Sequence, residues 1–204
     1  MKRQEAKEKT RQKILEAALE EFTRQGYRGA NTARIARAAG VAHGTVFLHF
    51  PDKDQLLFEV IRQRLVKISN RLYDAALQNE TALQSEAAHE SKEIESLCRV
   101  YLDHLNENTA FESMLAREMP NLPTVLKRQV FTIRSGIILH FHQAIQRGIN
   151  EGKLKDVNPT VALHVWFGTL HYYLANQEML AAPGEIINEK GNQLIDYFLT
   201  TLRS

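Results

Sequence analysis

The sequence predicts an all-α protein of about nine helices, with a three-helix unit at the N-terminus followed by a larger helical body. Two observations support this fold class. Apolar residues recur every three or four positions along nearly every segment, and no segment alternates apolar and polar residues as a strand would. Glycine and proline fall between these periodic segments, where a helix has to end.

The first helix is expected to run from Thr10 to Gln25. Its inward face is predicted from apolar residues at helical spacing, namely Ile14, Ala17, Ala18, Leu19 and Phe22. Gly26 follows the last periodic residue, so the helix should end there.

Residues 32–51 have the layout of a helix-turn-helix. Thr32 is the expected N-cap of a short helix, because a hydroxyl can accept from a free backbone N–H of the first turn. Ile35, Ala36 and Ala39 form a narrow apolar stripe on this helix. Gly40 comes next, where the chain needs a positive φ, and a residue without Cβ adopts it at the lowest cost.

A second short helix is predicted from Ala42 to Phe50, and Pro51 ends it. Val46 and Phe50 fall on its buried side, and the opposite side carries His43, Gly44, Thr45, Leu48 and His49. Two helices joined by a turn of about three or four residues can place the second helix in a DNA major groove. We therefore divide the chain into a helix-turn-helix domain at 1–53 and a helical domain at 54–204.

The remaining elements are also helical. Asp52 and Asp54 can cap a long helix that extends to about Leu77, and the polar segment 79–92 suggests a loop or a weak helical turn. Further helices are expected at 94–106, 109–118, 123–151, 159–180 and 185–202. Pro120, Gly152 and the pair Pro183–Gly184 lie between these helices, and Pro123 and Pro159 stand at the start of two of them.

Composition places the chain among ordinary globular proteins, with 44% hydrophobic and 25% charged residues in 204. No apolar run reaches about 18 residues, and the N-terminus is too polar for a secretory signal, so we expect a cytoplasmic protein with no membrane partner. Cys98 is the single cysteine, which favours a buried, inert thiol. The eight histidines show no metal-binding spacing, so no metal or cofactor is expected.

The net charge of +2 is unevenly distributed. Residues 1–53 carry 11 Lys and Arg against 6 Asp and Glu, whereas residues 54–204 carry 15 against 18. The helix-turn-helix side is therefore basic, as an electrostatic partner of DNA phosphates would be. The basic N-terminal segment around Lys7 and Arg11 fits either a phosphate-binding arm or a solvated terminus.

The sequence TARIARAAGVAHGTVFLHFPDKDQLL, preceded by TRQKILEAALEEFTRQGYRGANT, resembles the DNA-binding region of the TetR family of bacterial transcriptional regulators. The resemblance covers the first quarter to third of the chain. It implies a dimer that binds a palindromic operator, most often as a repressor released by a small-molecule effector. Two residues depart from the family pattern: Phe47 replaces a tyrosine that contacts a phosphate, and Ala42 replaces a capping serine.

We predict the DNA-binding surface from this layout. Arg34, His43, Gly44, Thr45 and Leu48 are expected to face DNA, while Thr32, Phe47, His49 and Lys53 are expected to contact phosphates and sugars. For His49, a buried position bracing Phe50 is the alternative.

The last two helices predict a dimer. The segments VALHVWFGTLHYYL and IINEKGNQLIDYFL are apolar over wide faces that a small monomer cannot easily cover. The resemblance implies a four-helix interface between two copies. The residues assigned to it are Trp166, Gly168, His171, Ala175, Ile195 and Phe198.

The helical body is the expected effector domain. Polar and aromatic residues that could line a cavity for an amphipathic, aromatic or anionic molecule are Tyr101, His104, Met114, Arg117, Arg134, Trp166 and Tyr172. For any one of them, core packing is the alternative. Two other functions stay open: a DNA-binding protein regulated by a partner without a ligand, and an enzyme using His104, Tyr101 or Glu112. No catalytic residue is assigned, because no nucleophile is paired with a base.

Overall fold

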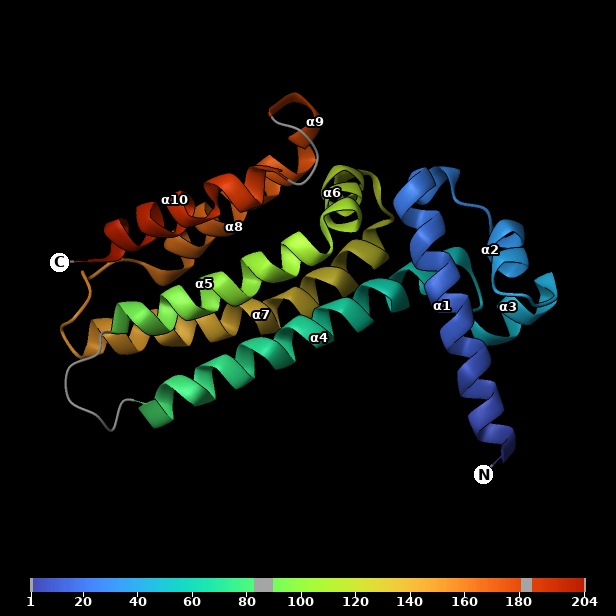
Figure 1. Cartoon of the computed structure of the whole chain (residues 1–204), viewed down its shortest axis with the longest axis horizontal. Helices are drawn as coiled ribbons and strands as arrows, with labels where there is room; N and C mark the ends of the chain where they lie inside the picture. Colours follow the sequence, from blue (N-terminus) through green and yellow to red (C-terminus); the bar gives the residue numbers. More distant parts are fainter. Residues whose placement is uncertain (1, 83–89, 181–184, 204) are drawn as a thin grey trace. The chain divides into compact units, whose positions relative to one another are not determined.

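The computed structural model describes residues 2–82, 90–180 and 185–203, and within these ranges it confirms the all-α fold (Figure 1). These residues form ten α-helices and one 3₁₀ helix. They separate into two compact units. The first contains the chain up to Arg64 together with Arg117–Thr132, and the second contains Leu65–Ala116 and Ile133–Ser204.

Helix α1 (Lys2–Gly29) begins earlier than predicted and changes direction at Gly26. The early start follows from the composition of residues 2–9, which are lysine, arginine, glutamate, glutamine and alanine, all good helix formers. Gly26 has φ of 67°, which breaks the helix as expected. A Cβ at Gly26 would lie 2.8 Å from Oε1 of Glu118.

Helix α2 (Thr32–Ala38) is capped one residue earlier than predicted. Asn31 has an extended backbone, and its side chain accepts from the N–H of Ala33 at 2.8 Å. Thr32 is therefore the first helical residue, and the prediction that it is the cap was wrong. The predicted turn is confirmed, with φ of 67° at Gly40.

Helix α3 (His43–His49) follows Ala42, whose side chain makes no cap hydrogen bond, as the alanine predicts. The next helix, α4 (Lys53–Ala82), begins with Asp52 accepting from the N–H of Gln55 at 2.7 Å. Asp54 does not share this capping role, since its carboxylate accepts a hydrogen bond from the Tyr27 hydroxyl. The first unit also contains η1 (Met119–Asn121) and the start of α7 (Thr124–Asn150).

The second unit is built around an aromatic centre. Tyr101 of α5 (Glu90–Glu107) meets Phe167 of α8 (Pro159–Ala175) and Phe141 of α7, with ring centroids 5.1 and 6.3 Å away. Trp166 of α8 stacks on Phe198 of α10 (Glu185–Leu202). Helix α10 also packs against α5, and α6 (Thr109–Glu118) follows α5 after a one-residue break. Four helices thus contribute to one core.

The predicted helix at 159–180 is two helices. Asn176 leaves the helical conformation, and its side chain donates to the carbonyl of Tyr172 at 2.8 Å, ending α8 before α9 (Gln177–Leu180). Residues 83–89 of the predicted loop and the predicted break at Pro183–Gly184 lie outside the described residues.

Candidate functional site

Helix α3 is anchored on one side and exposed on the other. Val46 and Phe50 are buried, each 1% exposed, as predicted. Leu48 is 82% exposed and Phe47 is 43% exposed. Because water is a poor environment for large apolar side chains, two of them on one short helix indicate a surface built for contact. Figure 1 shows α3 with α1 and α2 in the same helical group.

A side-chain contact links the first residue of α3 to the first residue of α2. Thr32 Oγ1 lies 2.9 Å from Nε2 of His43, and the His43 ring meets Phe47 edge-on at 5.1 Å. A Cβ at Gly44 would have no atom within 4 Å, and Thr45 is half-buried. The structure therefore brings together five of the predicted DNA-binding residues around one helix N-terminus.

Arg34 is not a free side chain. It donates through Nε to Oε1 of Glu21 at 2.8 Å and through Nη2 to the carbonyl of Gly29 at 2.8 Å. Glu21 is 3% exposed, although it carries a charge. Burial raises the pKa of Glu21, but hydrogen bonds from Arg34, Asn31 and Arg24 outweigh burial, so the pKa lies below its ordinary value.

A second arginine holds the other end of α3. Arg11 pairs with Glu59 of α4 and lies 5.1 Å from the centre of the Phe50 ring. Burial, Lys7 and Arg11 together lower the pKa of the neighbouring His49. The N-terminal segment of α1 thus places positive charge beside His49, as a phosphate contact requires.

Lys53 is also engaged within the unit. Its Nζ donates to the carbonyl of Tyr27 at 2.8 Å and lies 4.5 Å from the centre of the Tyr27 ring. Burial, followed by the hydrogen bond to Asp54, raises the pKa of Tyr27 to about 12. Phosphate contacts by Lys53 and Arg34 stay predictions.

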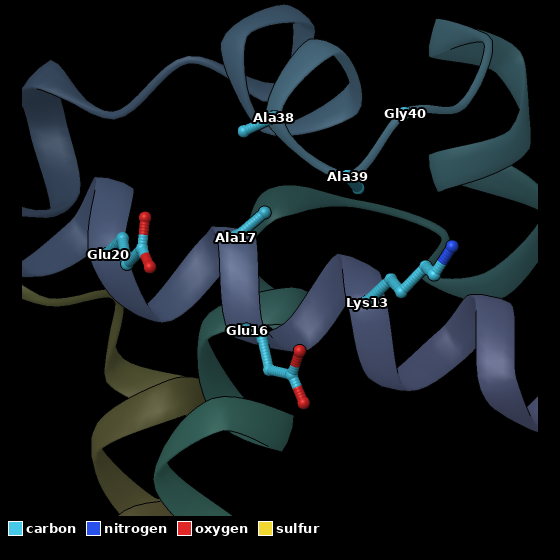
Figure 2. Close-up of a pocket in the computed structure, with 7 residues that line it drawn as sticks. All are labelled: Lys13, Glu16, Ala17, Glu20, Ala38, Ala39 and Gly40. Carbon is cyan, nitrogen blue, oxygen red and sulfur yellow. The ribbon is translucent and has the colours of Figure 1, made fainter.

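A groove of about 330 Å³ lies between α1 and the end of α2 (Figure 2). Alanine and glycine line one part of it, and charged side chains from α1 line the rest. The lining residues are Lys13, Glu16, Ala17, Glu20, Ala38, Ala39 and Gly40. None of the predicted DNA- or effector-binding residues is among them, and its two carboxylates make it unsuited to phosphate.

The second unit contains a polar cluster, which we call the body cluster: the buried His104 and Glu112 with the half-buried Arg134 and His171. His104 Nε2 lies 3.5 Å from Oε1 of Glu112, and Nη2 of Arg134 lies 3.9 Å from Oε2. Arg134 Nη1 lies 3.5 Å from Nε2 of His171. Burial, followed by Arg134, lowers the pKa of His171 to about 4, so its ring is neutral near pH 7. Burial raises the pKa of the neighbouring Tyr101 to about 12.

The other predicted effector residues are scattered. Met114 and Trp166 are 2% and 3% exposed, whereas Tyr172 is 58% exposed and Arg117 lies on the surface of the first unit. Nε1 of Trp166 is buried without a hydrogen-bond partner among the described residues. Among the residues that the structure describes, no group of three or more His, Cys, Asp or Glu residues could hold a metal ion.

The residues assigned to the dimer surface differ in how exposed they are. Trp166, Ile195 and Phe198 are at most 3% exposed in the core between α8 and α10, whereas Gly168 is on the surface and His171 and Ala175 are half-buried. Beside Gly168, a row of apolar residues is exposed on α8, comprising Val161, Val165 and Tyr172. On α10, Tyr197 is 70% exposed.

Two residues of the site were missed at the sequence level. Asn31 was overlooked because the neighbouring threonine is an equally good cap type. Glu21 lies seven residues after Ile14 and four after Ala17, so a charged residue falls on the predicted apolar face of the first helix. That mismatch was the available signal of a buried ion pair.

Three comparisons with known proteins agree with this geometry. The family described as "Bacterial regulatory proteins, tetR family" matches residues 14–60. The "Fatty acid metabolism regulator protein" of Bacillus subtilis (strain 168) is 27% identical over 158 residues, which cover 77% of each chain. The "HTH-type transcriptional repressor AcnR" of Corynebacterium efficiens is 34% identical over 68 residues, covering 33% of this chain and 36% of that repressor.

A solved structure shows the same fold over nearly the whole chain. The transcriptional regulator FadR from Bacillus subtilis in complex with stearoyl-CoA superposes with a TM-score of 0.78 at 19% identity, covering 93% of this chain and 98% of that one.

Together, the all-α fold and the exposed helix α3 on a basic unit define a helix-turn-helix transcriptional regulator. Its N-terminal region, residues 14–60, matches the TetR family of bacterial regulatory proteins. In the described residues, no helix combines the length and apolar character needed to cross a membrane.

Proposed function

We propose that two copies of the chain bind a palindromic operator and repress transcription until a small-molecule effector binds the helical body. The exposure of Phe47 and Leu48 on a helix anchored by Val46 carries the DNA-binding part of this proposal. His43, Gly44 and Thr45 occupy the helix N-terminus, where backbone N–H groups attract phosphate. The 1–53 segment acts as the DNA-binding domain, and 54–204 acts as the regulatory and dimerisation domain.

The dimer forms through α8 and α10. Val161, Val165, Gly168 and Tyr172 lie on one face of α8, at spacings of four, three and four residues. Three of them are apolar side chains more than half exposed, and glycine lets a second helix approach closely. Trp166 and Phe198 support this surface from beneath. A twofold dimer presents two α3 helices to successive major grooves.

A long-chain acyl-CoA is the effector class that we propose first. The solved FadR structure contains stearoyl-CoA, and the related Bacillus subtilis protein is named a fatty acid metabolism regulator. In this chain, Arg134 supplies a cation and Tyr101, Phe141 and Phe167 supply apolar surface. Helices α4 and α7 each contribute to both compact units, so an effector in the body can shift the population of DNA-fitting states.

DNase I footprinting on the DNA upstream of the chain's own gene tests operator binding. We expect one protected palindrome, with half-sites about one helical turn apart. If no promoter-proximal DNA is protected by wild-type protein at low salt, operator binding is wrong.

Thermal shift measurements test the effector. Stearoyl-CoA at a hundred times its Kd should stabilise the chain by about 2.7 kcal/mol, whereas free coenzyme A should not. Arg134→Gln should reduce the stabilisation, while Arg37→Gln, at an exposed position of α2, should leave it intact. Stearoyl-CoA should also release the chain from operator DNA, and this release is the second measurement of the test. Stabilisation by neither ligand would favour partner regulation over this effector class.

A further inference from the structure

A buried carboxylate lies behind the DNA-binding helices. Glu21 is 3% exposed, whereas its neighbour Glu20 is exposed. Burying a charge costs several kcal/mol unless good partners compensate, so its partners are informative. Oε1 of Glu21 accepts from the N–H of Asn31 at 3.0 Å and from Nε of Arg34 at 2.8 Å, and Oε2 accepts from Arg24 at 3.2 Å. The carboxylate is therefore fully engaged.

Two of these donors form the start of α2. Asn31 is the N-cap residue, and Arg34 lies in the first turn, where it also donates to the carbonyl of Gly29. Thr32, between them, meets His43 at the start of α3 at 2.9 Å. A chain of direct contacts thus runs from Glu21 to the N-terminus of the helix that we expect to enter the major groove.

We propose that Glu21 is a positioning residue for DNA binding, which holds Asn31 and Arg34 in place and thereby sets the N-terminal end of α3. This inference rests on the proposed operator binding. It also assigns Arg34 two simultaneous roles. Nε and Nη2 hold Glu21 and Gly29. Nη1 has no hydrogen-bond partner among the described residues, and it donates to a DNA phosphate from a side chain that is 46% exposed.

The sign of one substitution separates positioning from simple electrostatics. Glu21→Gln removes a negative charge from a surface that approaches DNA, so charge alone predicts tighter binding. Positioning predicts weaker binding, because a neutral amide no longer fixes the guanidinium and the N-cap residue. The two effects therefore have opposite directions.

The probe is a duplex of about 30 base pairs, selected from random DNA by the wild-type chain. Affinity is measured by fluorescence anisotropy at several salt concentrations, well below the unfolding temperature, with the active fraction determined by titration. Glu93→Gln is the matched control, because Glu93 is 6% exposed and pairs with Arg147 in the other compact unit. Arg34→Lys and Arg37→Lys form a second pair at constant charge.

We expect Glu21→Gln to weaken binding about tenfold and to lower the magnitude of the salt slope by about one per DNA-binding domain, since one phosphate contact is lost. Glu93→Gln should keep the wild-type affinity and slope even where it lowers stability. Arg34→Lys should weaken binding about fivefold, because lysine lacks the planar fork, and Arg37→Lys should not.

Wild-type or tighter binding by Glu21→Gln would overturn the inference while leaving operator binding intact. If Glu21→Gln folds too poorly to measure, the comparison of Arg34→Lys with Arg37→Lys tests the inference instead. Equal DNA affinities of these two variants would overturn it. A wild-type chain that selects no duplex would overturn the proposed function together with the role of Glu21.

Discussion

Individual side chains in the DNA-binding unit carry two kinds of role. Arg11, Arg34 and Lys53 are cations that the structure ties to Glu59, Glu21 and Tyr27. Phe47 and Leu48 are instead exposed on α3. The basic excess of this region is thus used partly to hold the unit together.

Restoring the hydroxyl group at position 47 should strengthen DNA binding. Phe47 is 43% exposed, so Phe47→Tyr has space for the hydroxyl and gains a donor for a phosphate oxygen. We expect about tenfold tighter operator binding, the equivalent of one hydrogen bond to a charged group. Fluorescence anisotropy measures the operator affinity. The control is Phe131→Tyr, which changes another exposed phenylalanine. Equal gains in both variants would contradict a specific contact at position 47.

His171 should make stability depend on pH. Its folded pKa is about 4 and its ordinary value is 6.5, so the unfolded chain binds the proton more tightly. The sign follows directly: stability is full above pH 6.5 and falls as the pH drops toward 4, by about 3 kcal/mol. Urea unfolding across this range should show a smaller loss for His171→Gln. His164→Gln, at an exposed position of the same helix, should behave as wild type, and identical curves for all three proteins would refute the assignment.

Helix boundaries follow local chemistry where a single residue decides them. Gly26, Gly40 and Asp52 act as predicted, because positive φ and a carboxylate cap are local requirements. The break at Asn176 was missed, since asparagine tolerates both helix and turn.

Two glycines should respond in opposite ways to alanine. Gly26→Ala should lower the free energy of unfolding by about 1–2 kcal/mol, because Gly26 has φ of 67°. Gly44→Ala should raise it by about 0.5–1 kcal/mol, since Gly44 lies in α3 with open space around it. Gly44→Ala should nevertheless weaken operator binding, because the added methyl group faces DNA. Chemical unfolding and anisotropy test both effects, and Gly136→Ala, also in open space, is the control.

At the scale of the whole molecule, the chain forms two compact units. The boundary between them falls within α4, after Arg64, and residues 117–132 belong to the first unit. The functional boundary between 53 and 54 stays a prediction. Helices α4 and α7 contribute to both units, so each is a route for the proposed coupling of effector binding to DNA binding. The exposed face of α8 is the surface through which two such molecules are proposed to pair.

A charge on that face should prevent the proposed dimer from forming. Val165 is 53% exposed, so Val165→Glu should leave the fold intact but place a carboxylate beside its twofold mate. We expect a monomer in sedimentation velocity and operator binding weakened at least about tenfold, because one half-site is lost. Val66→Glu, at a 42% exposed position of α4, is the control. A dimer that survives Val165→Glu would refute this interface.

The sequence by itself determined the helical class, the helix-turn-helix and the residues exposed on α3. These depend on periodicity and turn chemistry within about twenty residues, so they can be read locally. Only the tertiary structure decided which charges pair and which apolar residues are covered. Glu21 and Arg34 are 13 positions apart, Trp166 and Phe198 are 32 apart, and neither local propensity nor spacing specifies such contacts. They arise when helices pack, because a buried charge needs a partner and an apolar ring needs a neighbour wherever the fold supplies one.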